Sequence, residues 1–278
     1  MTYRSSVLVP TRTQARMLAK YGPWAVVTGA SSGIGREMAI RLAEARFNLV
    51  LVGRRKSALD QFAVDLMARH GTDTLVIAID LAGAGASETV EAATVDLNVG
   101  LLIAAAGFGT SGPLLDTALD QEMEMIQVNC AAVFGLSQGF GRRFAERKGG
   151  GIVLMSSIVA FQGVPFSANY AATKAYVQSL AEAMHVELAP RGVDVLASAP
   201  GPVDSGFAAR AGMKMGAALK PANVAQATLD ALGRKTTVLP GVMSKALSYS
   251  LVPLPRRVRA RIMGRVMYGM TKHAHDTG

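Results

Sequence analysis

The sequence predicts an α/β fold, a doubly wound parallel sheet of about seven strands with helices on both faces and a helical C-terminal extension. Short apolar runs alternate with helix-compatible segments along the chain. A glycine-rich turn separates the first apolar run from the first long helix. Half of the 278 residues are hydrophobic, which is enough to fill a core covered on both faces of a sheet.

The glycine-rich turn reads Thr28-Gly29-Ala30-Ser31-Ser32-Gly33-Ile34-Gly35 and joins a predicted buried strand, 24–27, to a predicted helix, 36–46. A helix N-terminus offers a phosphate several backbone N–H donors and a favourable dipole. Gly29 permits the tight turn, Gly33 removes a Cβ from the phosphate path, and Gly35 lets the helix pack on the strand. The turn therefore predicts a Rossmann-type site for the pyrophosphate of a dinucleotide.

The second predicted strand, 48–52, ends at Gly53-Arg54-Arg55. An acidic side chain at this position would hold the ribose hydroxyls of NAD, whereas a guanidinium binds a 2′-phosphate through charge-assisted hydrogen bonds. The two arginines therefore favour NADP as the cofactor. The alternative is that Arg54 and Arg55 belong to a solvated turn between strand and helix.

The remaining elements follow in order along one domain with no internal repeat. We expect an N-terminal arm over 1–22 that contains a short helix at 13–20, a catalytic NADP-binding domain over 23–240, and a basic amphipathic extension over 241–278. Further helices are predicted at 56–70, 120–148 and 221–232, and another contains Tyr170 and runs to about 188. Further strands are predicted at 74–79, 101–104, 151–155, 193–198 and 237–239.

Several polar residues lie where chemistry is expected. Ser157 follows the fifth strand, at the carboxyl end where open parallel sheets build their sites. Thirteen residues later, Tyr170 and Lys174 are spaced i and i+4 and so share one helix face. Asn129 is a poor interior helix residue, so its predicted helical setting needs compensation. The alternatives are an amphipathic surface for the Tyr170 helix and a tolerated surface position for Asn129.

These motifs, in this order, resemble the short-chain dehydrogenase/reductase family over about residues 24–240. The resemblance implies hydride transfer between the nicotinamide and a carbonyl or alcohol carbon. It further implies that Tyr170 exchanges the proton, that Lys174 favours the phenolate and binds the nicotinamide ribose, and that Ser157 holds the substrate oxygen. Asn129 would anchor a relay water at a local break in its helix. The family also implies a homodimer or homotetramer.

The resemblance also assigns a cofactor-binding set. Asp80 would hydrogen-bond the adenine amino group, although it could instead cap the next helix, and Pro200 to Ser205 would lie beside the nicotinamide. Ala104-Ala105 replaces the asparagine pair that the family usually carries, and Ser205 replaces a threonine but keeps the hydroxyl. The full set is Gly29, Ser31, Ser32, Gly33, Ile34, Gly35, Arg54, Arg55, Asp80, Leu81, Ala106, Gly107, Tyr170, Lys174, Pro200, Gly201, Val203 and Ser205.

An apolar ketone or acyl substrate is expected because apolar side chains flank the predicted site and residues 206–219 have the makeup of a mobile apolar lid. The opening at 21–24 and the C-terminal extension are similar to the 3-oxoacyl and steroid reductase branch. The flanking side chains are Phe108, Phe161, Val164, Pro165, Phe166, Phe207, Met213 and Met215.

Net charge and cysteine content limit the other possibilities. Of the total charge of +9, residues 1–20 hold +4 and residues 241–278 hold +6, which leaves −1 for the body and argues against a nucleic-acid-binding core. The lone Cys130 excludes an intrachain disulfide and a cysteine-only metal site, and we predict no metal. With no apolar run of 18 residues, we expect a cytoplasmic enzyme. The alternatives are a catalytically silent NADP-sensing binding protein and a basic membrane-associated adaptor.

The segment 256–270 predicts an amphipathic basic helix, with Val258, Ile262, Met263, Val266, Met267 and Met270 on one half and Arg257, Arg261 and Arg265 on the other. An anionic lipid surface would satisfy both halves, so we predict a peripheral contact with anionic membrane. In the alternative, the apolar half covers the enzyme's own lid or a partner subunit. Arg259 intrudes on the apolar half and favours neither.

Overall fold

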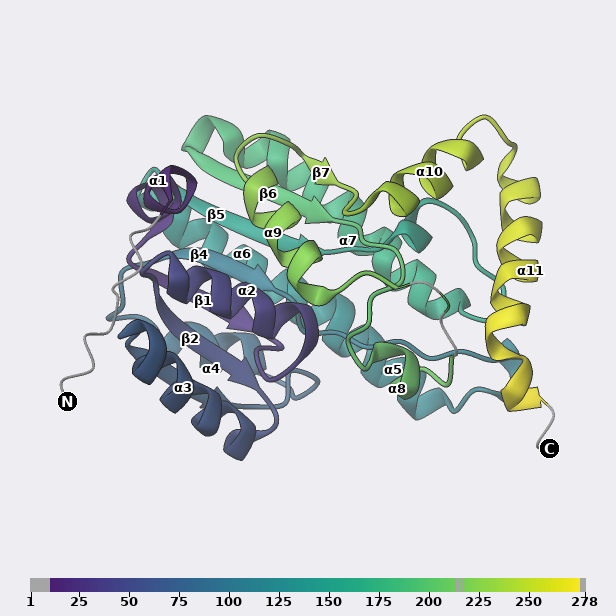
Figure 1. The fold of residues 1–278 in the computed structure, drawn as a ribbon, viewed down its shortest axis with the longest axis horizontal. Coiled ribbons are helices and arrows are strands. Elements are labelled where there is room, and N and C mark those ends of the chain that lie inside the picture. Colours follow the sequence, from purple (N-terminus) through teal and green to yellow (C-terminus); the bar gives the residue numbers. More distant parts are fainter. Residues whose placement is uncertain (1–10, 214–215, 217, 276–278) are drawn as a thin grey trace, which may run out of the picture.

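The computed structural model describes residues 11–213, 216 and 218–275, with side chains up to Thr271. Its centre is a seven-stranded sheet in the order β3-β2-β1-β4-β5-β6-β7, in which every neighbouring pair is parallel (Figure 1). The predicted doubly wound fold is confirmed. The strands are β1 (Trp24–Thr28), β2 (Asn48–Gly53), β3 (Thr74–Ala78), β4 (Val99–Ala104), β5 (Gly150–Met155), β6 (Val193–Ser198) and β7 (Thr237–Val238).

Helices cover both faces of the sheet and enclose two apolar cores. One core joins the sheet to α2 (Gly33–Glu44), α3 (Lys56–His70) and α9 (Pro221–Ala231). The other joins it to α4 (Ala86–Ala92), α6 (Ala132–Glu146) and α7 (Ala168–Leu188). Because side chains alternate along a strand, Val27 enters the first core and Val26 the second, which explains why the strands read as continuous apolar runs.

The chain reverses direction across the sheet between β1 and β4, since β2 and β3 lie on one side of β1 and the later strands on the other. In open α/β sheets a ligand crevice forms at the carboxyl ends of the strands at such a point. The turn after β1 and the segment after β4 therefore both face this crevice.

The predicted helical region 120–148 is interrupted at its middle. It consists of α5 (Leu119–Ile126), a π-helical turn (Gln127–Ala131) and α6. Asn129 lies inside the π-helical turn, in agreement with the local break that the family resemblance implies. Such turns occur mostly as single insertions into α-helices and are frequent at functional sites.

The helices at the two ends of the described chain have different surroundings. Near the N-terminus, α1 (Arg12–Tyr21) is capped by Thr11 and buries Met17 and Tyr21 against the sheet, with the Tyr21 hydroxyl donating to Asp194 at 2.6 Å. Three later helices, α8 (Phe207–Arg210), α10 (Val242–Leu251) and α11 (Arg256–His275), gather at the opposite end of the molecule (Figure 1). Short 3-10 turns occupy Leu114–Asp116, Ile158–Phe161 and Ala189–Arg191.

Candidate active site

One large cavity of about 930 Å³ follows the carboxyl edge of the sheet. Every residue of the predicted cofactor-binding set lines it, and so do Ser157, Tyr170 and Lys174. Asn129 is fully buried and does not line the cavity. The cavity continues past Tyr170 beneath α8 and between α10 and α11. The polar cofactor end and an apolar chamber are therefore parts of the same space.

The glycine-rich turn has the geometry of a phosphate cradle. Gly33 has φ +58°, a conformation that side-chain-bearing residues rarely adopt. A Cβ on Gly35 would lie 2.6 Å from the Gly29 carbonyl oxygen, so only glycine allows α2 to approach β1 this closely. The Ser32 side chain at the N-cap makes no capping hydrogen bond. The first N–H groups of α2 are thus available to an anion, which fits a pyrophosphate.

Two arginines face the cavity beside this turn. Arg55 donates from Nη2 to Ser31 Oγ at 3.0 Å and so lies directly over the glycine-rich turn. Arg54 pairs through Nη1 with Glu124 Oε1 at 3.1 Å and with Asp80 Oδ2 at 3.6 Å. The other carboxylate oxygen of Asp80 accepts from the Ala82 N–H, so Asp80 caps its own turn. It does not cap the next helix, as the alternative interpretation expected, because the N-cap of α4 is Gly85.

A third cation from the lid region, Arg210 of α8, joins this end of the cavity. Its guanidinium lies over the Phe108 ring, with 4.5 Å between Cζ and the ring centroid. Burial lowers the pKa of Arg210, and the neighbouring charge of Arg54 lowers it further. Sequence reasoning did not single out Arg210, although it is the one charged residue between Gly206 and Met213.

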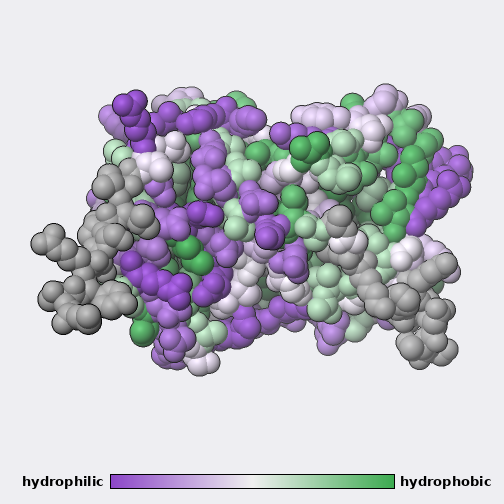
Figure 2. All heavy atoms as spheres, viewed as in Figure 1, coloured by the Kyte–Doolittle hydropathy of each residue, from purple (hydrophilic) through white to green (hydrophobic). Residues whose placement is uncertain are grey.

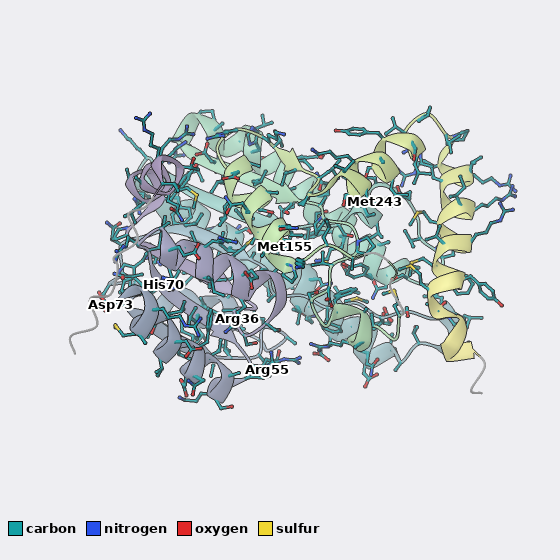
Figure 3. The ribbon with its side chains drawn as sticks, viewed as in Figure 1. Arg36, Arg55, His70, Asp73, Met155 and Met243 are labelled. Atoms are coloured by element: carbon teal, nitrogen blue, oxygen red, sulfur yellow. The ribbon has the colours of Figure 1, made fainter. Side chains whose placement is uncertain are left out.

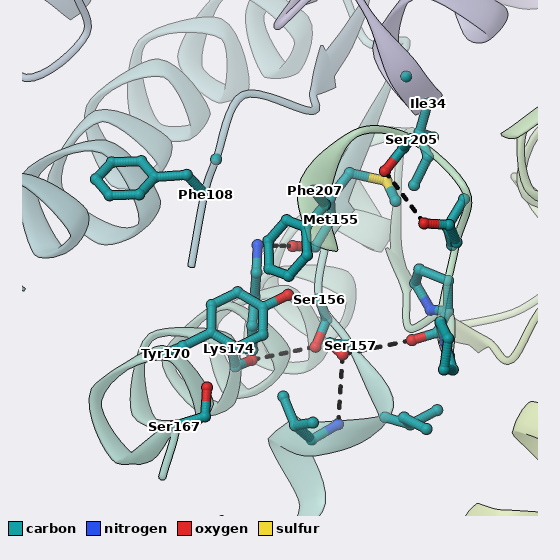
Figure 4. A pocket seen from close by; sticks show the side chains of 18 of the residues that line it. Ile34, Phe108, Met155, Ser156, Ser157, Ser167, Tyr170, Lys174, Ser205 and Phe207 are labelled. Carbon is teal, nitrogen blue, oxygen red and sulfur yellow. Dashed lines mark hydrogen bonds between the residues drawn. The ribbon is translucent and has the colours of Figure 1, made fainter. Parts of the chain in front are cut away.

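The Tyr170 hydroxyl lies at the junction between the cofactor end and the apolar chamber (Figure 4). Burial raises the pKa of Tyr170 to about 12, while a hydrogen bond with Ser157 opposes the rise. Part of the ring remains accessible from the open cavity, and Phe207 of the lid packs against it at 5.2 Å between centroids. Tyr170 is therefore a phenol at neutral pH.

Lys174 is held one helical turn further along α7. Its Nζ donates to the Met155 carbonyl at 2.8 Å at the end of β5 and lies 5.7 Å from the Tyr170 ring centroid (Figure 4). Ser156 Oγ donates to the Lys174 carbonyl at 3.1 Å and fixes the same helix to β5. Burial lowers the pKa of Lys174 to about 8, so the ammonium is still the prevalent form at neutral pH.

Asn129 obtains the compensation that its helical setting requires from two neighbouring segments. Its Nδ2 donates to the Phe108 carbonyl at 2.8 Å and to Thr173 Oγ1 at 3.1 Å, and its Oδ1 accepts from the Phe108 N–H at 3.1 Å. Both side-chain N–H groups are therefore used within the protein. The side chain ties the segment after β4 to α7, and a relay water could reach it only as a donor to Oδ1.

The unusual Ala104-Ala105 pair is accompanied by another link between the central strands. Thr28 Oγ1, at the end of β1, accepts from the Ala106 N–H at 2.9 Å. Gly107 leaves room for Asn129, whose Oδ1 would lie 2.9 Å from a Cβ at that position. Hydroxyl and amide groups from neighbouring segments thus secure the strand ends where the family usually places asparagines.

The apolar chamber differs from the prediction in its walls. Phe108, Phe207 and Met213 line the cavity as expected, and Met215 lies outside the described residues. Phe161, Val164, Pro165 and Phe166 do not line it; Val164 and Phe166 instead belong to the layer behind Met213. Further walls come from α10, the turn after it and α11, through Leu247, Leu251, Leu254, Ile262, Met263, Val266, Met267 and Met270.

Most of the apolar half of α11 is therefore turned toward the protein, as in the alternative interpretation of this helix, whereas Val258 is exposed and does not line the cavity. Met267 is buried and packs with Met263 and Met270 against the lid and the start of α7. Figure 2 shows this inner side as hydrophobic and the outer side as hydrophilic. Arg259, which seemed misplaced on the apolar half, donates to the Leu254 carbonyl at 2.7 Å and to the Val252 carbonyl, closing the turn between α10 and α11.

The chain is similar in sequence to a known family and to several known proteins. Residues 23–215 match the family model for short chain dehydrogenases. A 7beta-hydroxysteroid dehydrogenase of Collinsella aerofaciens is 30% identical over 81% of this chain and 89% of its own length. A very-long-chain 3-oxoacyl-CoA reductase of Podospora anserina is 37% identical over 65% of this chain, but the match covers only 54% of that protein.

Solved structures agree with the sequence relatives. The structure of a 7beta-hydroxysteroid dehydrogenase superimposes with a TM-score of 0.82 at 27% identity, covering 89% of this chain and 98% of the other. A short-chain dehydrogenase of Sphingobium yanoikuyae in complex with NADPH gives a TM-score of 0.75 at 29% identity, covering 84% and 95%. The likeness to the first structure extends over most of the chain, beyond the residues that the family model matches.

Proposed function

Because the chain belongs to the short-chain dehydrogenase family of oxidoreductases, we propose that it uses NADP(H) to interconvert a carbonyl and a secondary alcohol on an apolar substrate. The observation that carries this proposal is the continuity of the cavity. A glycine-rich cradle with three arginines lies at one end, an apolar chamber lies at the other, and Tyr170 stands between them. A cofactor and an apolar carbonyl could meet only near that hydroxyl.

The choice of NADP rests on the charge at the cofactor end. Arg55 lies over Ser31, and Arg54 and Arg210 add two further guanidiniums that face the same cavity. A 2′-phosphate carries close to two negative charges and accepts paired hydrogen bonds from guanidinium groups. Asp80 and Glu124 are paired with Arg54, and this pairing reduces the repulsion between their carboxylates and the phosphate. The relative that binds NADPH supports the same assignment.

The residues around Tyr170 can handle the proton. Bound NADPH would supply the hydride. Tyr170, a phenol at neutral pH because burial raises its pKa to about 12, would give its hydroxyl proton to the carbonyl oxygen. Ser157, whose hydroxyl hydrogen-bonds with Tyr170 and makes longer contacts of 3.4 Å to Pro200 and Val159, would hold the same oxygen. The nearby Lys174 ammonium would stabilise the phenolate left behind.

An apolar substrate is supported by the side chains that form the chamber. The described side chains that form it include Met213, Leu251, Ile262, Met263 and Met267, and none of the described residues that line it is acidic. Thioether side chains adapt to irregular shapes, so a bulky ring system or a long acyl chain would fit here. The relatives named for 7beta-hydroxysteroids and very-long-chain 3-oxoacyl-CoA act on substrates of these two kinds. Assembly into a homodimer or homotetramer stays a prediction.

A carbonyl panel tests the proposal. The purified protein would be mixed with NADPH and, in turn, with a steroid ketone, a bulky cyclic ketone, a 3-oxoacyl thioester and a small polar ketone. We expect stoichiometric NADPH oxidation with the bulky apolar carbonyls and little with the polar one. NADPH binding without turnover on any carbonyl would support a cofactor-sensing protein instead.

A further inference from the structure

The C-terminal hairpin, made of α10, the turn Val252 to Pro255 and α11, forms a corner at the edge of the molecule (Figure 1). Its inner side lines the apolar chamber through residues such as Leu251 and Met267. Its outer side faces away from the rest of the chain. Among the described residues, no helix is long and apolar enough to cross a membrane.

The outer side is rich in exposed apolar side chains. Val242 is 82% exposed, Tyr249 66% and Met243 61% on α10, and Val252 in the turn is 58% exposed. Figure 3 labels Met243 on α10. Of the 18 large hydrophobic side chains exposed in the described part of the chain, eight belong to this hairpin, which is about an eighth of the sequence. Two of these eight, Leu247 and Val266, also line the chamber, and the other six do not. Clustering of this kind marks an interaction surface, whereas scattered exposed hydrophobics need no explanation.

The same side is exclusively cationic. The sequence has no aspartate or glutamate between Ala231 and His275. Lys245, Arg256, Arg257, Arg261 and Arg265 are all exposed, and nitrogen-tipped side chains extend outward from α11 (Figure 3). Apolar groups beside unbalanced cations fit the boundary between acyl chains and anionic headgroups. A two-fold contact with a second copy would place this cationic surface against the same surface of the other copy, and the like charges would repel. An anionic surface is therefore the better fit.

We propose that the C-terminal hairpin docks on an anionic lipid surface. The turn and the exposed side of α10 enter the headgroup boundary, and the α11 arginines bind lipid phosphates. The structure thereby assigns lipid contact to α10 and the turn, because the apolar half of α11 already lines the chamber. Leu254 belongs both to the turn and to the chamber wall, so docking places the chamber next to the lipid. Delivery of an apolar substrate by this route rests on the proposed function; the docking itself does not.

The arginines set the expected size of the effect. One cation near an anionic surface strengthens binding about fivefold. Replacing Arg257, Arg261 and Arg265 together by glutamine should therefore weaken binding on the order of a hundredfold. Replacing Arg69, Arg142 and Arg191 by glutamine removes the same charge from exposed positions on α3, on α6 and in the Ala189–Arg191 turn, and should leave binding nearly unchanged. Truncation is unsuitable because it would remove a chamber wall.

The test is co-sedimentation of the full chain with phosphatidylglycerol-containing or pure phosphatidylcholine vesicles, without cofactor or substrate. We expect binding to the anionic vesicles only, weakening with salt. Val252→Glu with Tyr249→Glu should abolish it, whereas Val64→Glu with Val186→Glu, which adds the same charge at exposed positions elsewhere, should not. NADPH turnover of a bulky cyclic ketone, measured separately without vesicles, should survive in all four variants.

Three outcomes would overturn the proposal. The intact protein could fail to bind anionic vesicles, or both glutamate pairs could reduce binding equally. Alternatively, the Val252 and Tyr249 variant could change the mass of the protein by sedimentation velocity while no vesicle binding is seen, which would assign the surface to a second copy. Vesicle binding without turnover on any carbonyl would refute the proposed function and leave the docking intact.

Discussion

Removing the Arg54 guanidinium should weaken NADPH binding while leaving NADH binding nearly unchanged. A hydrogen bond to a charged group contributes about 1.5–3 kcal/mol, which corresponds to roughly 10- to 150-fold in a dissociation constant. The side chain of Arg54 is 45% exposed, so solvent screening favours the lower end, and we expect about a tenfold loss for Arg54→Ala. The variant also leaves Asp80 and Glu124 without their cation, which acts in the same direction.

The Glu124 carboxylate provides the opposing change. It pairs with Arg54 at 3.1 Å in a half-exposed contact, and such pairs contribute about 0.2–1 kcal/mol. A 2′-phosphate can therefore displace it, and Glu124→Gln should tighten NADPH binding by at most about fivefold. Isothermal titration of wild type and both variants with NADPH and NADH measures all of these constants. Equal affinity of the wild type for the two cofactors, or a parallel loss for both in Arg54→Ala, would refute the assignment.

Three further changes follow from the geometry of the site and the core. Burial lowers the pKa of Lys174 to about 8 from an unfolded value near 10.5, so the folded state binds fewer protons than the unfolded state between these pH values. Because the ammonium is lost as pH rises through 8, kcat/KM for reduction should fall above about pH 8. In a pH–rate profile, Lys174→Arg should move this fall in kcat/KM to higher pH. By the same linkage, the lysine's cost to stability is full below about pH 8 and disappears as pH rises through 10.5. Asn129→Ala leaves the buried Phe108 backbone groups without partners and should destabilise the fold by about 3 kcal/mol in urea unfolding, with a lower kcat; unchanged stability would contradict the bracing role. Tyr21→Phe removes one hydrogen bond to Asp194 but leaves the Lys20 ion pair, so a loss of only about 1 kcal/mol is expected, and a loss several times larger would mean that α1 packing depends on the hydroxyl.

The sheet and the main helices could be predicted because their sequences are locally consistent. The strand 193–198 and the helix 56–70 have the predicted bounds, since apolar runs and a glycine stop coincide there. The glycine-rich turn and the i, i+4 spacing of Tyr170 and Lys174 likewise indicated which residues line the cavity. These are properties of short segments, which sequence patterns describe well.

Features that depend on distant segments were missed or left open. The periodicity of α11 gives its apolar half correctly except for the exposed Val258, but it does not say what covers that half. The cover is the layer around Met213 and the lid, against which Met263, Met267 and Met270 pack. Arg259 looked misplaced because its carbonyl partners belong to the preceding turn. Arg210 reaches the cofactor end only because α8 folds across Phe108. α10, whose outer side is both apolar and basic, was not predicted.

The central claim is that Tyr170 gives its proton to a carbonyl oxygen while NADPH is held elsewhere in the same cavity. The most direct measurement compares wild type with Tyr170→Phe, using the turnover rate on a bulky ketone and the NADPH dissociation constant. Loss of a general acid costs about 10²- to 10⁴-fold, so the variant should retain less than about a hundredth of the wild-type rate and bind NADPH within about twofold of wild type. A variant that turned over at close to the wild-type rate, or that lost NADPH binding along with its activity, would contradict this account.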